Sequence, residues 1–79
     1  MDYNYLKKLK ELLAENFGIE PKEVDESAYF EEDLNLGEYE LIELLSELEE
    51  YYQIEFEPED KEELDTIGSL ITILRDKAE

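Results

Sequence analysis

The 79-residue sequence contains no cysteine and no histidine. Without cysteine there is no disulfide framework or zinc–thiolate site, and without histidine the commonest general base and metal ligand is missing. Catalysis by a Ser–His or Cys–His pair is therefore excluded. The three glycines stand apart at positions 18, 37 and 68, so no glycine-rich loop is present to cradle a phosphate. We do not expect an enzyme.

Basic residues are scarce, with 7 Lys and Arg against 25 Asp and Glu and a formal net charge of −18. Nucleic acid is excluded as a partner and an anionic membrane surface is disfavoured, because both bind proteins through Lys and Arg. No apolar run approaches the roughly 20 residues of a membrane span. The N-terminal segment also lacks the apolar stretch of a signal peptide. We expect a cytoplasmic protein.

A high net charge can keep a chain disordered, but the apolar content here favours folding. Leu, Ile, Val and Phe make up 23 of the 79 residues. That share lies above the level of roughly 20% at which disorder becomes the better prediction. We therefore expect residues 1–79 to form one domain with one modest core, and the protein to be a monomer.

Apolar residues at spacings of three and four predict three main helices. The first spans residues 3–17 and the second about 37–52. A third helix begins after a cap at Asp65 or Thr66. A short helix from Pro58 to about residue 64 precedes it. The residues predicted to face the core are Leu6, Leu9, Leu12, Leu13, Phe17, Leu41, Ile42, Leu44, Leu45, Leu48, Tyr52, Ile67, Leu70, Ile71 and Leu74.

Two connections separate these helices. Residues 19–36 form a long irregular segment, and its apolar residues predict that it is pinned along the core. These residues are Ile19, Val24, Ala28, Tyr29, Phe30, Leu34 and Leu36. Residues 53–57 alternate in polarity but have no obvious pairing partner, which predicts an extended connector. The fold class is therefore all-α, a small bundle of three main helices and one short helix with a long first loop.

Four segments resemble the acyl carrier proteins. Residues 30–34 (FEEDL) resemble the family's F-x-E-D-L segment before its second helix, and residues 43–52 resemble the E-L-x-x-x-L-E-E-x-F stretch within that helix. Residues 54–60 are similar to its I-x-I-P-D-E segment, and residues 66–70 (TIGSL) to its T-V-G-D-L segment. The resemblance implies a four-helix carrier fold, and its pieces occur in the family's order.

The family's Asp-Ser-Leu motif, whose serine takes up phosphopantetheine, is replaced. An ungapped match places Gly37, Glu38 and Tyr39 at its three positions. A carboxylate cannot form the phosphodiester that the family makes through serine, and the serines at positions 27, 46 and 69 lie elsewhere. The resemblance therefore implies a phosphopantetheine-attachment position at Glu38 that has lost its serine, and no bound cofactor.

Glu38 has two interpretations. In the first, Asn35 is the N-cap of the second helix and Glu38 reaches back to it in a capping box. In the second, its carboxylate mimics the phosphate of a modified serine, so that partners accept it as the loaded form.

The second helix also resembles the family's recognition helix. Its acidic face would steer a protein with a basic patch, such as a synthase or a modifying enzyme. Tyr39 could act as an exposed aromatic anchor there. The predicted partner-binding residues are Glu38, Tyr39, Glu40, Glu43, Ser46, Glu47 and Glu50.

Three functions follow from these features. The first is an acyl-carrier-like interaction module without a prosthetic group. The second is a working acyl or peptidyl carrier in lipid, polyketide or peptide synthesis, loaded by a non-standard route. The third is an acidic divalent-cation-binding protein. No particular metal site is expected, because a calcium loop starting at Asp33 would need Gly where Glu38 stands and Glu where Leu44 stands.

Overall fold

The computed structural model describes the backbone of residues 2–79 and the side chains of residues 5–79. It confirms the predicted all-α bundle of three main helices and one short helix. The elements are α1 (Asp2–Phe17), a turn of 3₁₀ helix η1 (Pro21–Glu23), α2 (Glu38–Tyr52), α3 (Pro58–Glu62) and α4 (Ile67–Ala78).

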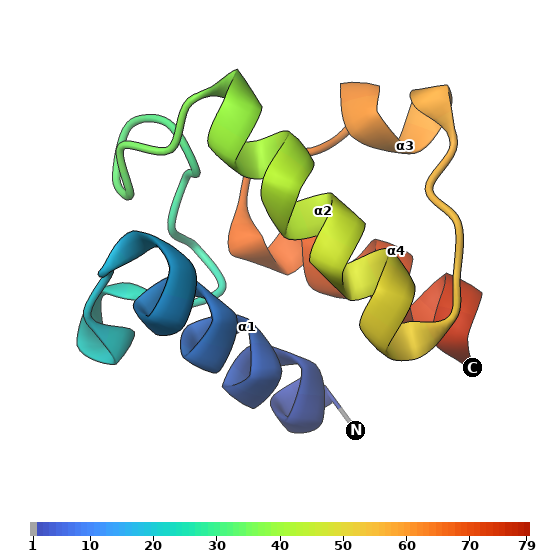
Figure 1. The fold of residues 1–79 in the computed structure, drawn as a ribbon, viewed down its shortest axis with the longest axis horizontal. Helices are drawn as coiled ribbons and strands as arrows, with labels where there is room; N and C mark the ends of the chain where they lie inside the picture. The colour runs from blue at the N-terminus through green and yellow to red at the C-terminus, as the bar shows by residue number, and fades with distance from the viewer. Residues whose placement is uncertain (1) are drawn as a thin grey trace.

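The three long helices pack around one apolar core. Helix α1 runs in roughly the opposite direction to α2, and α4 lies behind them (Figure 1). Helix α1 contacts both of the others. Each of the three helices contributes two completely buried leucines, namely Leu9, Leu13, Leu44, Leu48, Leu70 and Leu74. The apolar residues spaced three and four apart therefore predicted correctly which helix faces pack against one another.

The long first loop is pinned to the core, as its apolar residues predicted. Val24, Phe30 and Leu36 are among its buried side chains. Its backbone also pairs with the start of α4, where the N–H of Ile67 donates to the carbonyl of Ala28 at 3.0 Å. Tyr29 does not serve as an anchor, because its side chain is 45% exposed. Backbone hydrogen bonds to the start of α4 hold this part of the loop instead.

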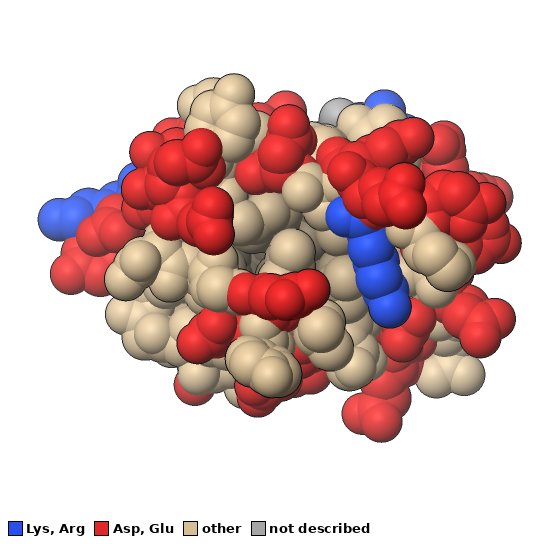
Figure 2. Space-filling view, turned by 90° about the horizontal axis from the view of Figure 1, so that it is seen from above, with Lys and Arg blue, Asp and Glu red and all other residues tan. Residues whose placement is uncertain are grey.

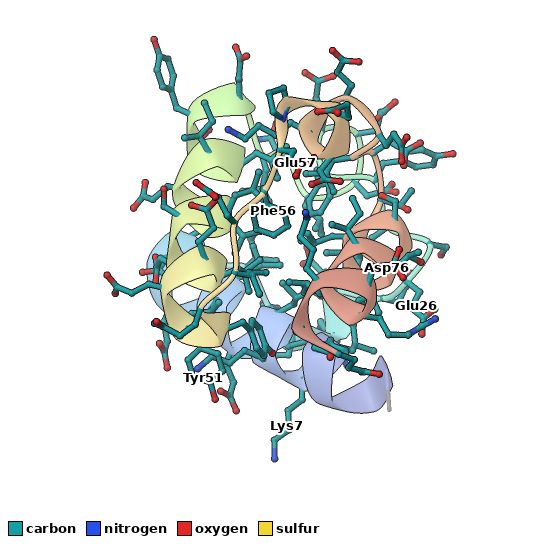
Figure 3. The ribbon with its side chains drawn as sticks, turned by 90° about the vertical axis from the view of Figure 1, so that its right-hand side faces the viewer. Lys7, Glu26, Tyr51, Phe56, Glu57 and Asp76 are labelled. Carbon is teal, nitrogen blue, oxygen red and sulfur yellow. The ribbon has the colours of Figure 1, made fainter. Side chains whose placement is uncertain are left out.

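Residues 54–57 cross from α2 to α3 as a connector without helix, as predicted, but Gln53 is a left-handed turn residue with φ of 58° that ends α2. Phe56 points from it into the space between α2 and α4 (Figure 3) and is buried. The N–H of Phe56 donates to the Glu49 carboxylate of α2 at 2.8 Å. Phe56, the half-buried Ile54 and hydrogen bonds to Glu49 thus hold the connector on the bundle.

One prediction for the buried faces of the helices is wrong. The apolar spacing predicts Ile42 on the buried face of α2, but its side chain is 47% exposed. It lies two residues from the buried Leu44, which corresponds to about 200° around the helix axis. The core covers an arc of α2 centred on Leu44, Leu45 and Leu48, and Ile42 lies outside that arc.

Candidate functional site

The first turn of α2 is capped by residues other than those predicted. Gly37 is the N-cap, and its N–H donates to the Glu40 carboxylate at 3.0 Å. Asn35 instead adopts a left-handed conformation with φ of 57°. It closes a turn in which the N–H of Leu36 donates to the carbonyl of Phe30 at 2.8 Å. The predicted capping box of Asn35 and Glu38 is therefore wrong, because that turn ends before the helix begins.

The Glu38 carboxylate is left unused by the fold. Glu38 is the first residue of α2 and its side chain is exposed. Within residues 5–79 the carboxylate has no hydrogen-bond or ion-pair partner. Its charge lies at the positive end of the helix dipole, which favours an anion there. The group is therefore free to meet another molecule.

The other predicted partner-binding residues lie along α2. Tyr39 is 87% exposed, the side chains of Glu40, Glu43, Ser46 and Glu50 are exposed, and that of Glu47 is half-buried. Figure 2 shows the face of the molecule uppermost in Figure 1, where acidic side chains predominate and basic ones are few. The structure thus exposes Glu38, Glu40, Glu43 and Glu50 of α2, although the Glu40 carboxylate is also engaged in the cap.

Sequence reasoning missed Ile42 as a residue of this surface. Its exposed side chain lies three residues after Tyr39 and four residues before Ser46. Residues at these spacings share one face of a helix. The spacing of Ile42 from Tyr39 and Ser46 is visible in the sequence, but the neighbouring leucines favoured the prediction that Ile42 is buried. We call the exposed residues Glu38, Tyr39, Glu40, Ile42, Glu43, Ser46 and Glu50, with the half-buried Glu47, the α2 face.

A pocket of about 390 Å³ opens beside the first turn of α2. It lies between that turn, the long loop and the segment that follows α3. Its lining includes apolar side chains from all three segments, namely Phe30, Leu36, Leu41 and Leu64. Glu38 is also part of its lining.

An ion pair holds α3 near this pocket. Lys77 of α4 lies 2.9 Å from the carboxylate of Asp60, and that carboxylate also accepts from the N–H of Glu57 at 2.9 Å. The hydrogen bond from Glu57 and then the one from Lys77 lower the pKa of Asp60 below its ordinary value. Because α3 has only five residues, these contacts rather than its own helical hydrogen bonds fix its place on α4.

The serine side chains do not supply an attachment point at the first turn of α2. Ser27 Oγ donates to the Asp25 carboxylate at 2.7 Å in the long loop. Ser69 Oγ donates to the carbonyl of Thr66 at 2.8 Å and belongs to the cap of α4. Ser46 is exposed, but it lies eight residues after Glu38, about 12 Å along the helix axis. The residues at the start of α2 therefore do not fit a serine-linked phosphopantetheine.

Two other features are absent from the described part of the chain. No group of three or more acidic residues there is placed to hold a metal ion. No helix among the described residues is long and apolar enough to cross a membrane.

The comparisons with known proteins agree with the fold. Residues 7–74 match the family model described as "Phosphopantetheine attachment site". The chain is 37% identical over 67 residues to the acyl carrier protein of Chlamydia caviae, covering 85% of this chain and 87% of that protein. The chain belongs to the acyl carrier protein family. It is also 35% identical over 69 residues to the acyl carrier protein of Chlamydia muridarum, covering 87% of this chain and 90% of that protein.

Membership of the acyl carrier protein family confirms that the protein is not an enzyme, because the family's proteins are non-catalytic carriers. Proteins of this family interact with synthases and modifying enzymes. A role of the carrier-protein type is therefore shown. The exposed first turn of α2 and the pocket beside it are its candidate functional site.

Proposed function

We propose that residues 1–79 form a single acyl-carrier-like interaction domain that docks through the α2 face on a basic partner protein and carries no phosphopantetheine. The observation that carries the proposal is the free, exposed Glu38 carboxylate at the first position of α2. The match to the family's Asp-Ser-Leu motif aligns the modified serine with this position.

The capping geometry supports a recognition role for Glu38. If Glu38 capped α2, that structural role would explain its carboxylate, and no partner protein would be needed to account for it. Glu40 already accepts the hydrogen bond from the Gly37 N–H, so the fold does not need Glu38 for that purpose. A negative charge at this point resembles the charge of a phosphate attached to the same helix end.

The composition of the α2 face supports a basic protein as the partner. Tyr39 and Ile42 give it an apolar centre, since they are 87% and 47% exposed. Glutamates flank them along the helix. Apolar anchors with a charged rim are typical of protein interfaces, and the acidic rim would speed the approach of a basic surface.

Mass spectrometry tests whether the protein is loaded. The full chain is incubated with coenzyme A and a phosphopantetheinyl transferase, beside an acyl carrier protein that the same enzyme modifies. We expect the mass of this chain to stay unchanged while the control gains one phosphopantetheine. A matching gain on this chain would support the carrier alternative and overturn the proposal of an unloaded module.

Nuclear magnetic resonance tests the docking surface with the same transferase as the modifying enzyme. We expect amide shifts along α2 that shrink as sodium chloride is added, because salt screens exposed charges. The Glu38→Gln variant should bind about two- to five-fold more weakly, the range for one exposed ion pair. The matched control Glu62→Gln, an exposed glutamate of α3, should bind like the unaltered chain. The absence of shifts along α2, or shifts unaffected by salt, would contradict the proposal.

A further inference from the structure

The pocket beside Glu38 combines an apolar interior with an acidic border. Its volume of about 390 Å³ lies within the range of roughly 300–1,000 Å³ that is usual for ligand sites. The apolar lining comes from α2, the long loop and the segment after α3, as described above. Four acidic residues complete it, namely Glu31, Glu32, Glu38 and Asp65.

Among residues 5–79, none of these four carboxylates is paired with a basic side chain. Among the residues whose side chains are described, no Lys or Arg lines the pocket. None of the four side chains forms a hydrogen bond or an ion pair within that part of the chain. Lys77 is engaged with Asp60 instead. The apolar space is therefore bordered by acidic residues and by no basic residue among those described.

We propose that this pocket receives an arginine side chain of the docked partner, with the aliphatic stem on the apolar lining and the guanidinium among the border carboxylates. The inference rests on the proposed function, because it names the group by which a basic partner would engage the α2 face. Charge complementarity selects a cation, and the apolar interior selects one carried on a hydrophobic stem.

The lining favours arginine over lysine and over an anion. A guanidinium is planar, less strongly hydrated than an ammonium, and able to bind carboxylates through two parallel hydrogen bonds. Tyr29 and Phe30 also line the pocket, and guanidinium groups stack on aromatic faces. A phosphate or a free carboxylate would be repelled by the acidic residues that line the pocket.

The test uses N-acetyl-arginine amide as the probe and N-acetyl-citrulline amide as its uncharged counterpart of similar shape. We expect saturable amide shifts of residues 29–41 and 64–65 with the arginine probe, and smaller ones with the citrulline probe. The Asp65→Asn variant should bind the arginine probe about two- to five-fold more weakly. The matched control Glu63→Gln removes one charge from an exposed residue that does not line the pocket, and should bind normally.

The outcomes separate this inference from the proposed function. Equal shifts with both probes, or equal weakening in both variants, would overturn selection of a cation by the pocket. Docking of the transferase on α2 without any arginine shifts would overturn the pocket inference and leave the proposed function standing. Arginine shifts without transferase docking would assign the pocket to a free cationic ligand, and would overturn a partner side chain as its occupant.

Discussion

The two glutamates in the first turn of α2 should differ in their effect on stability. Glu38 and Glu40 are both exposed and both lie near the positive end of the helix dipole. Only Glu40 accepts the N–H of Gly37, at 3.0 Å. We therefore expect Glu40→Ala to destabilise the protein more than Glu38→Ala.

The pair of variants isolates one hydrogen bond. Both changes remove one charge from the same turn, so their effects on the net charge of −18 and on helix propensity nearly cancel. The favourable interaction of each carboxylate with the dipole, about 0.3–1 kcal/mol, also largely cancels. The remaining difference is the capping hydrogen bond, with a net value of about 0.5–1.5 kcal/mol.

Urea denaturation followed by far-ultraviolet circular dichroism measures this difference, with thermal melting as a second readout. A difference of about 1 kcal/mol corresponds to about 4–8 °C in Tm for a domain of this size. The amide proton of Gly37 should also exchange faster in Glu40→Ala than in Glu38→Ala. Equal losses of stability, or a greater loss in Glu38→Ala, would refute the assignment of the cap to Glu40.

Three further predictions concern the core, the termini and the charge. Leu44→Ala should cost about 2–5 kcal/mol because Leu44 is fully buried. Ile42→Ala should lower the free energy of unfolding, measured by urea denaturation, by only about 0.5 kcal/mol. Equal losses in the two variants would place Ile42 in the core. The hydrogen bond from Tyr5 to Glu79, together with burial, raises the pKa of Tyr5 from 10.0 to about 12. The folded protein binds the Tyr5 hydroxyl proton more tightly than the unfolded chain does, which stabilises the fold. This contribution is fully present below pH 10.0 and is lost as the pH rises through about 12. Tyr5→Phe should therefore lose less stability than the unaltered chain across this window in urea titrations. Sodium chloride, divalent cations or mildly acidic pH should raise Tm, because 25 acidic side chains repel one another. A Tm unchanged under all three conditions would show that charge repulsion does not limit stability.

The start of α4 shows what could be predicted locally. Thr66 accepts from the N–H of Ser69 at 3.1 Å, and Ser69 Oγ accepts from the N–H of Thr66 at 3.1 Å. Both partners lie within one turn of the chain, so residue types at fixed spacing suffice to predict such a cap. The start of α2 differs, because the long loop closes a turn at Asn35 and leaves Gly37 as the N-cap. That closure depends on the buried Phe30 and Leu36, which no spacing rule relates to a cap.

The sequence by itself determined the helices, most of the core and the excess of negative charge. It also determined that Glu38 stands at the position that aligns with the family's serine. These properties depend on residue identity and on periodicity, which are local. Only the tertiary structure decided that Ile42 faces outward, that Glu40 rather than Glu38 caps α2, and that a pocket opens beside Glu38. Each of these depends on where the long loop and the residues after α3 come to rest against α2. Packing between segments far apart in the chain sets that arrangement, and helix periodicity carries no information about it.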